Sequence, residues 1–496
     1  MHIDRRGLLK SSSVLIAGAG LPGWTSALRA TPNGLPAYFE DIERRTFRWF
    51  WDTANPKNGL VPDRWPTPTF CSIAAVGFAL GAYAIGVERG WCSRDDARDR
   101  TLTTLRFFWN APQGPDRTGT TGYKGFFYHF LDMQTGARFK DVELSSVDTT
   151  ILLMGVLFAG QYFDRDDSGE REIRDLSQKL YDRADWNFFR SDGRAAVSMG
   201  WHPEHGLIPA NWVGFNEGMF VNILALGSRT HPGPPNLWSQ WTSRYADFWR
   251  GEGPTRHVGF APLFGHQYSH IWIDFRGIQD AVMRQAGFDY FENSRRATYT
   301  NWAWCSVNRM GWEGYSKELW GLTACDGPGD FQITYKGQKR QFFGYAARGP
   351  LIEPEGRDDG TIAPTAALGS LPFAPEIVLP CAEAMTKRPG LFDRYGFKDS
   401  FNPSFTYSGV KVEGGTVDPK NGWIAKDYLG IDQGPILLQA ANHRDDFIWR
   451  YMRRVPAIRR GLQRAGFTGG WLANGQAQRG SLVAAVPSVP RERNLP

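Results

Sequence analysis

Carboxylate side chains stand beside aromatic and amide side chains in three short segments of this sequence. The segments are ELSSVDT (143–149), FNEGM (215–219) and GIDQGPI (430–436), and their acidic residues are Glu143, Asp148, Glu217 and Asp432. Two carboxyl groups that face one sugar can cut a glycosidic bond, because one protonates the leaving oxygen while the other activates water or attacks the anomeric carbon. The residue types therefore favour glycoside hydrolysis.

Glu217 is the candidate for the general acid. It follows Trp212 and Phe215, and an apolar wall raises the pKa of a carboxyl group towards neutrality. A nearby helix start would favour the ionised form instead. In the simplest alternative, Glu217 only caps the first turn of its helix.

The base is left open among Glu143, Asp148 and Asp432. If Ser145 or Ser146 caps a helix, Glu143 lies in the preceding loop and Asp148 in the first turn, so that both reach one cleft. The alternative is that Asp148 only serves the helix terminus. A proline three residues after Asp432 suits a helix start.

The same segments and similar ones supply the predicted sugar contacts. These are Tyr123, Lys124, His129, His266, Tyr268, Arg295, Arg296, Asp326 and Asp359. Each has a structural alternative: the two arginines can form an ion-paired helix face, and His266 with His270 can be hydrogen-bonded core residues.

Two patterns that resemble metal sites do not carry a metal prediction. His266 and His270 are four residues apart, but no HExxH motif accompanies them. The segment from Asp164 to Asp175 matches several EF-hand positions, but it ends in Asp instead of Glu and has Arg171 at a position that is usually apolar. We expect a solvated acidic turn there, and no metal ion or other cofactor.

Composition favours a sugar substrate over a nucleic acid. The 496 residues include 20 Trp, 17 Tyr and 33 Phe, and flat aromatic side chains stack on the apolar faces of pyranose rings. The net charge is +6, of which residues 1–30 carry +3 (four basic residues against Asp4), so +3 remains (6 − 3). That charge is too small and too dispersed for a nucleic-acid-binding groove.

Helical periodicity positions these segments. Apolar residues at three- and four-residue spacing, together with capping signals, predict helices over the following ranges: 37–54, 73–89, 93–108, 147–163, 170–188, 216–226, 238–250, 278–285, 292–306, 375–385, 435–442 and 447–454. Alternating strand patterns are scarce, and 331–335 and 405–412 are the best hairpin candidates. About a dozen helices joined by long loops, with no linker between residues 36 and 470, predict one all-α catalytic domain built as a double ring of helices. We expect residues 471–496 to form a flexible tail.

The N-terminus has the features of an export signal. Arg5-Arg6 stands before a short apolar stretch, and small residues offer cleavage near Ala27 or Ala30, so residues 1–30 are predicted to be a twin-arginine signal peptide. The mature protein is then periplasmic or secreted, without a membrane segment. The five cysteines leave at least one unpaired, and we expect small core residues with at most one disulfide.

From about Tyr38 to Phe467 the sequence resembles the glycoamylase-like family, glycoside hydrolase family 144. The segments KGFFYHFLDM, ELSSVDT, FNEGM, HQYSH, IDFRGI, ENSRRAT, DDGTIAPTAA and GIDQGPI carry this resemblance. It implies an (α/α)6 barrel, endo-acting hydrolysis of β-1,2-glucan to sophorooligosaccharides, and Glu217 as the general acid.

Two other functions remain open. One is an exo-acting or transglycosylating enzyme on β-1,2-glucan or another β-glucan, which would differ only in how loops close the cleft. The other is a non-catalytic periplasmic glucan-binding protein, which would keep the aromatic residues but would not need Glu217 and a second carboxylate. In each case the partner is a saccharide, and we expect a monomer or a small homo-oligomer.

Overall fold

The computed structural model describes residues 34–190, 195–351, 357–407 and 409–473. The predicted signal peptide, residues 1–30, and all but the first three residues of the predicted tail lie outside this part of the chain. Trp471, at the start of that predicted tail, donates its indole N–H to the carbonyl oxygen of Asp274 at 2.8 Å, so the packed structure extends past residue 470.

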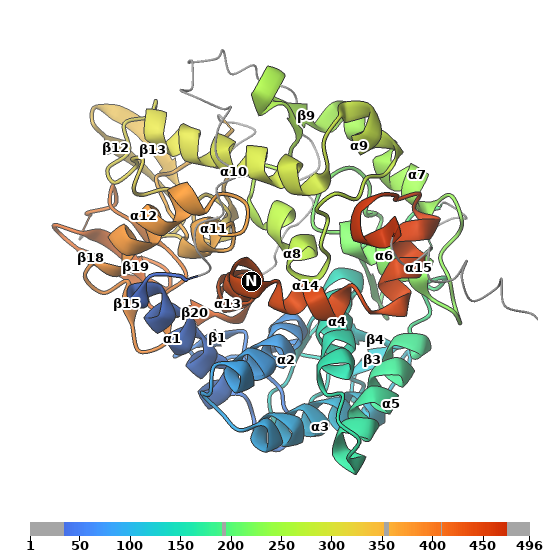
Figure 1. Cartoon of the computed structure of the whole chain (residues 1–496). Coiled ribbons are helices and arrows are strands. Elements are labelled where there is room, and N and C mark those ends of the chain that lie inside the picture. The colour runs from blue at the N-terminus through green and yellow to red at the C-terminus, as the bar shows by residue number, and fades with distance from the viewer. Residues whose placement is uncertain (1–33, 191–194, 352–356, 408, 474–496) are drawn as a thin grey trace, which may run out of the picture.

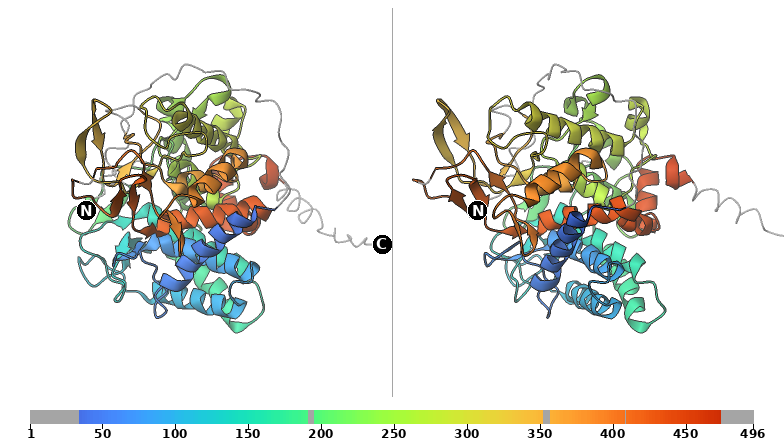
Figure 2. Two further views of the ribbon diagram at one scale, coloured as in Figure 1. Left: turned by 90° about the vertical axis from the view of Figure 1, so that its left-hand side faces the viewer. Right: turned by 60° about the vertical axis from the view of Figure 1, so that its left-hand side comes forward.

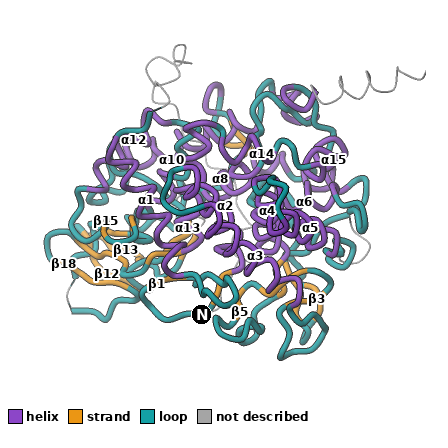
Figure 3. The backbone as a smooth tube through the Cα atoms, turned by 60° about the horizontal axis from the view of Figure 1, so that its bottom comes forward, coloured by secondary structure: helices purple, strands orange, loops and turns teal. Residues whose placement is uncertain are grey.

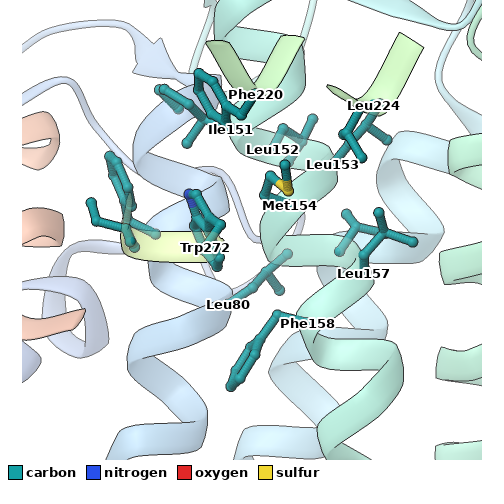
Figure 4. Packing of buried hydrophobic residues seen from close by; sticks show 14 of the residues in the cluster. Leu80, Ile151, Leu152, Leu153, Met154, Leu157, Phe158, Phe220, Leu224 and Trp272 are labelled. Atoms are coloured by element: carbon teal, nitrogen blue, oxygen red, sulfur yellow. The ribbon is translucent and has the colours of Figure 1, made fainter. Parts of the chain in front are cut away.

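Two helices with apolar side chains all round lie at the centre of the structure. They are α2 (Ile73–Glu88) and α4 (Ser146–Tyr162), and almost all of their residues are buried. A β-carbon on Gly155 would lie 2.2 Å from the carbonyl oxygen of Gly77, so glycine at this crossing lets the two backbones touch. Figure 4 shows their side chains meeting those of Phe220, Leu224 and Trp272 from neighbouring helices.

Amphipathic helices cover this centre. Three of them are α1 (Ala37–Thr53), α3 (Arg94–Asn110) and α5 (Ser168–Arg183), which bury one stripe each and pack against the inner helices or against one another. Ser93 accepts the N–H of Asp96 and donates to its carboxylate, so its side chain caps the start of α3.

The remaining helices complete the arrangement around the same centre. They are α6 (Met219–Gly227), α7 (Leu237–Thr242), α8 (Phe264–Trp272), α9 (Ala281–Ala286), α10 (Tyr290–Val307), α11 (Pro364–Leu368), α12 (Pro375–Thr386), α13 (Gly430–Asp445), α14 (Phe447–Met452) and α15 (Pro456–Arg464). Helix α13 packs against α1 and α2, so the last long helix lies beside the first two (Figure 1). The prediction of a mostly helical fold is confirmed.

Several helix boundaries differ from the prediction. Helix α6 begins at Met219 rather than Asn216, and α13 begins at Gly430 with Pro435 inside it. The predicted helix 238–250 breaks into α7 and the 3-10 turn Tyr245–Phe248. Helices α8, α11 and α15 were not predicted, because they are short and their burial depends on partners far away in the sequence.

Short strands are more numerous than predicted. The largest sheet has five antiparallel strands in the order β3 (Gly122–Tyr123), β4 (Phe126–Tyr128), β6 (Leu144–Ser145), β7 (Gly200–His202) and β8 (Gly206–Leu207). The hairpin β12 (Phe331–Tyr335) and β13 (Gln338–Phe342) is confirmed, with Ile333 opposite Arg340.

The predicted hairpin at 405–412 is wrong. The sheet in this region joins β17 (Phe401–Asn402), β19 (Gly422–Ala425) and β18 (Gly415–Asp418). The ring of Phe405 packs 5.0 Å from that of Phe342. The aromatic residues that suggested a strand therefore serve tertiary packing.

The strands mark one end of the helices. Strand β2 (Cys71–Ser72) runs directly into α2, β6 into α4, and β20 (Tyr428–Leu429) into α13. Loops and strands gather along this end in Figure 3, and Figure 2 shows the same separation from the side. Since three inner helices begin here, residues in their first turns lie close together.

All five cysteines are free thiols, and four of them are buried, in agreement with the expectation of small core residues. Among the described residues, no helix has both the length and the apolar run that crossing a membrane requires.

Candidate active site

Three of the predicted catalytic carboxylates lie at the strand-bearing end of the helices. Asp148 is in the first turn of α4, Asp432 is in the first turn of α13, and Glu217 is in the turn before α6. Their exposed fractions are only 4%, 5% and 7%. Burial raises the pKa of Tyr268 on α8, and the negative charges of Asp432, Glu217 and Asp148 add to the shift, so all three carboxylates lie near this phenol.

Glu217 does not act as a helix cap. Its residue stands two positions before the first residue of α6, which has no side-chain cap. The turn is held by the side-chain oxygen of Asn216, which accepts the N–H of Gly218, and by Ser269, whose hydroxyl donates to the carbonyl oxygen of Glu217 at 3.3 Å. The N-cap position of α6 therefore belongs to Gly218, the residue after Glu217.

Trp212 connects the turn of Glu217 to the start of α4. Its indole N–H donates to the hydroxyl of Ser146 at 2.8 Å. A β-carbon on Gly218 would lie 2.6 Å from the same ring, so residue 218 lets the turn lie flat against the indole. Trp212 thus links the turn that carries Glu217 to the first turn of α4, which carries Asp148.

Asp148 is held by two side chains. Ser145 caps α4 by accepting the N–H of Asp148 at 3.1 Å and donates its hydroxyl to the same carboxylate at 2.6 Å. The Nε2 atom of His129 lies 3.5 Å from the other carboxylate oxygen, and Nδ1 lies 3.0 Å from Glu143. The predicted residues His129, Glu143 and Asp148 therefore form one cluster.

Asp432 forms a carboxyl pair with Asp399. Both are buried, and each carboxyl group acts on the other. Burial and the neighbouring negative charge raise the pKa of Asp399 to about 6 and that of Asp432 well above its usual range. Asp399 also accepts the N–H of Asp326 and the hydroxyl of Ser400.

Arg64 partly neutralises this acidic region. Its guanidinium group donates to Asp326 at 2.8 Å and to Asp63 at 3.2 Å, and lies 3.8 Å from Asp427. The positive charge of this arginine is outnumbered by the carboxylates around it. A negative potential of this kind suits a transition state in which positive charge develops on a sugar ring.

Several predicted sugar contacts have structural partners instead. Asp359 is fully buried and accepts two hydrogen bonds from the buried Arg348, both at 2.8 Å. Arg295 and Arg296 on α10 pair with Glu376 and Glu292. These ion pairs fit the structural alternative for Asp359, Arg295 and Arg296, and their role as sugar contacts stays a prediction.

His266 is likewise a core residue. Burial lowers its pKa well below the usual range, so the ring is neutral. Its Nε2 accepts the N–H of Phe260, and its Nδ1 lies 3.4 Å from the hydroxyl of Ser294. Both ring nitrogens have partners and the ring lies 4.6 Å from that of Phe215, which fits the core-histidine alternative.

Tyr123 and Lys124 lie at the edge of the five-stranded sheet. Lys124 is exposed in the turn between β3 and β4, with its amine 5.8 Å from the ring of Tyr123. Tyr123 is half-buried, and its ring lies 5.2 Å from Phe188 and 5.4 Å from Trp201. These three half-exposed aromatic residues form a surface on which a sugar ring can stack.

Sequence reasoning missed Asp63, Arg64, Asp399, Asp427 and Trp201. Arg64 and Asp326 are 262 residues apart, and Asp399 lies in a segment without a motif. The one usable signal was the Trp-His pair at 201–202, which carries an aromatic residue beside a titratable one.

The structure gathers one group with the spacing of metal ligands among the described residues. It is the cluster of His129, Glu143 and Asp148, whose ligand atoms lie within 4.8 Å of one another. Their contacts also fit direct hydrogen bonding, as described above. In the predicted acidic turn, Asp164 pairs with Arg94, Asp166 with Arg171 and Asp175 with Lys179, so the three carboxylates point to separate basic partners.

The fold is mostly helical, and buried carboxylates lie at the starts of its central helices. Both features are typical of a helical glycosidase. Residues 209–456 match the family model described as "Glycoamylase: Putative glucoamylase". The chain belongs to this glycoamylase-like family, and the predicted resemblance is confirmed.

Relatives with solved structures share the fold along nearly their whole length. A protein of Bacteroides uniformis, described in the same words as a "putative glucoamylase", is 31% identical over 87% of this chain and 97% of its own, with a TM-score of 0.72. The endo-β-1,2-glucanase of Chitinophaga pinensis, solved with sophorotriose and glucose, is 26% identical over 88% of this chain and 100% of its own, with a TM-score of 0.73.

One curated relative acts from a chain end. It is the exo β-1,2-glucooligosaccharide sophorohydrolase (non-reducing end) of Parabacteroides distasonis, 26% identical over 85% of this chain. The present chain spans 57% of that protein's length.

Proposed function

We propose that this protein is a glycoside hydrolase that cuts β-1,2-glucan within the chain and releases sophorooligosaccharides. The observation that carries the proposal is the meeting of Glu217, Asp148 and Asp432 around Tyr268, because hydrolysis of a glycosidic bond needs a proton donor and a second carboxylate at one place. The names of the relatives supply the β-1,2 linkage.

The helices support the proposed (α/α)6 double ring. Helices α2, α4, α6, α8, α11 and α13 form the inner ring in this proposal. Contacts between α2 and α4, α4 and α6, α11 and α13, and α13 and α2 support their order. Helices α1, α3, α5, α10 and α12 belong to the outer ring, and a site at the inner helix starts is then the mouth of the barrel.

We assign the role of general acid to Glu217. Glu217 is only 7% exposed, and the next residue of its turn, Gly218, lies against the indole of Trp212. A carboxyl group that is shielded from water keeps its proton more readily, and it can then protonate the leaving oxygen.

We assign the role of base to Asp148. The raised pKa of Asp432 keeps that side chain protonated, so it is suited to donate a hydrogen bond to a sugar hydroxyl rather than to take a proton from water. Asp148 lies instead in the first turn of α4, where its carboxylate accepts a hydrogen bond from Ser145 and lies 3.5 Å from Nε2 of His129.

The internal mode of cleavage is supported by the extent of the matches. The alignment with the endo-acting enzyme of Chitinophaga pinensis covers all of that chain, whereas the one with the exo-acting enzyme covers little more than half. The exo mode is the second candidate, because the latter relative acts from the non-reducing end.

Product analysis on linear and cyclic β-1,2-glucans tests the proposal. A cyclic glucan has no end, so its cleavage requires internal attack. We expect both glucans to yield sophorooligosaccharides of mixed length, and we expect β-1,3- and α-1,4-glucans to remain intact. Release of a single disaccharide from the linear glucan alone would favour the exo mode, and activity only on α-1,4-glucan would contradict the substrate.

We also propose export through the twin-arginine pathway, on the evidence of Arg5-Arg6 and the apolar stretch that follows. Replacing both arginines by lysine should leave the precursor in the cytoplasm. Continued passage of this variant into the periplasm through the same pathway would contradict the assignment, and a lysine substitution at Arg29 provides the control.

A further inference from the structure

A fully buried ion pair lies beside the loop between β13 and β14 (Ala346–Ala347). Arg348, directly after β14, donates to both carboxylate oxygens of Asp359. The cost of removing two charges from water commonly offsets their mutual attraction. The role of this pair therefore lies in the backbone that it fixes.

The guanidinium group of Arg348 holds that loop. It donates to the carbonyl oxygens of Phe343 and Gly344, both at 3.1 Å, and to that of Ala346 at 3.3 Å. The carboxylate partner of this arginine accepts the backbone N–H of Phe343 at 3.0 Å. The ion pair thus fixes the residues on both sides of Tyr345, which is half-buried.

The strand pair places Tyr345 beside the acidic region. Strand β11 (Ala324–Cys325) pairs antiparallel with β14. Asp326 follows β11 and Tyr345 precedes β14, so the two residues leave the strand pair at the same end. The backbone N–H of Asp326 donates to the carboxylate of Asp399 at 2.8 Å. This contact connects the strand pair to the carboxyl pair at the start of α13.

Tyr345 also lies near Tyr268, the phenol around which the carboxylates meet. Burial raises the pKa of Tyr268, and the negative charges of Asp432 and of the Tyr345 phenolate add most to the shift. Glu217 and Asp148 contribute less. The strand geometry and this electrostatic effect agree in placing the half-buried ring beside the carboxylates.

We propose that the ring of Tyr345 contacts the glucosyl unit next to the scissile bond, and that Arg348 is a positioning residue that holds this ring in place. The inference rests on the proposed function, because a saccharide bound among the carboxylates would reach the ring. A tyrosine ring offers a flat apolar face to a pyranose ring at a low cost in conformational entropy.

Kinetic constants for β-1,2-glucan test the contact. We expect Tyr345→Ala to raise KM about tenfold with little change in kcat, because a stacking contact binds the substrate and the transition state alike. Tyr345→Phe keeps the ring and should keep most of the affinity. Tyr407→Ala is the matched control, since this half-buried tyrosine packs against the β12–β13 hairpin and donates its hydroxyl to the carbonyl oxygen of Thr334. It should keep the wild-type KM.

A double variant separates positioning from general support of the fold. Arg348→Lys keeps the positive charge opposite Asp359 but lacks the planar set of donors that reaches several carbonyl oxygens, so KM should rise as in Tyr345→Ala. Because Arg348 acts through Tyr345 in this proposal, the double variant should have a KM no higher than that of Tyr345→Ala. Increases that multiply in the double variant would overturn the positioning role.

The two Tyr345 variants decide the sugar contact even where the buried Arg348→Lys does not fold. With wild-type protein that turns over β-1,2-glucan, an unchanged KM in Tyr345→Ala would overturn the contact. Equal increases in Tyr345→Ala and Tyr345→Phe would overturn its assignment to the ring. Wild-type protein that neither binds nor cuts this glucan would overturn the proposed function, and the contact with it.

Discussion

The hydroxyl of Tyr268 on α8 donates a hydrogen bond, at 3.3 Å, to the carbonyl oxygen of Ile431 in the first turn of α13. In a regular helix, that carbonyl would accept the N–H of residue 435. Residue 435 is a proline inside α13 and has no N–H. The proline therefore frees a carbonyl next to Asp432, and the phenol that uses it lies among the three carboxylates.

This relationship predicts coupling between Tyr268 and Pro435. Tyr268→Phe leaves the buried carbonyl of Ile431 without its donor, so the free energy of unfolding should fall by about 1–3 kcal/mol. Pro435→Ala restores the helical N–H, and in the double variant part of that loss should return. Thermal unfolding of the two single variants and the double variant measures the coupling, and additive effects would contradict it.

The carboxyl pair predicts a pH dependence that Asp399→Asn should change. The folded-state pKa values of Asp399, about 6, and Asp432 lie above the unfolded value near 3.8. For groups whose pKa is raised, the stability contribution is fully present below pH 4 and is lost as the pH rises through about 6 and beyond. Removing one charge lowers the pKa of Asp432, so the variant should lose less stability between pH 4 and 7 than the wild type.

Denaturant unfolding of the wild type and of Asp399→Asn at a series of pH values checks this expectation. The pH–rate profile provides a second measurement. The limb that reports Asp432 should move to lower pH in Asp399→Asn, because the repelling charge is gone. An unchanged limb together with an unchanged stability profile would show that the two carboxyls titrate independently.

Some features of the fold and the site could be predicted from local sequence patterns, and others could not. The apolar runs of α2 and α4 and the Ser93 cap are encoded within single segments, and so is the Trp212–Glu217 segment. Helix α8 depends on distant partners: Ser294 lies beside His266, and Tyr268 bonds to Ile431. Two-residue strands contain too few positions for an alternating pattern to emerge.

The contacts of the acidic region could not be predicted from local patterns either. Asp399 meets Asp432 across a sheet and a helix start, and Arg64 meets Asp326 from the other half of the chain. No residue spacing in the sequence predicts such contacts. For the same reason, Asp359 and Arg348 were indistinguishable from ligand-binding residues until their ion pair was visible.

Metal removal should leave activity intact. The acidic turn with Asp164, Asp166 and Asp175 holds its carboxylates against separate basic side chains, and the His129 cluster is connected by direct contacts. We therefore expect unchanged turnover after exhaustive EDTA treatment followed by gel filtration. A loss that calcium restores would assign the metal to the acidic turn, and a loss that zinc restores would assign it to the His129 cluster.

The variant Glu217→Gln tests the central step of the proposed mechanism, the protonation of the leaving oxygen. A sugar alkoxide is a poor leaving group, and its protonation in the transition state contributes about 100- to 10,000-fold in rate. Glutamine keeps the shape and the hydrogen-bonding capacity of Glu217, and it carries no acidic proton. We expect the rate of glucan hydrolysis to fall at least about 100-fold, equivalent to about 2.7 kcal/mol of barrier. Oligosaccharide affinity and the unfolding temperature should remain unchanged. Hydrolysis of a substrate with an acidic phenol as leaving group should fall less, because that leaving group needs little protonation.

Asn216→Ala is the matched control, since it disturbs the same turn but leaves the carboxyl group. Near-normal glucan turnover in Glu217→Gln, or an equal loss on both substrates, would refute the acid assignment and make Glu143 the next residue to test.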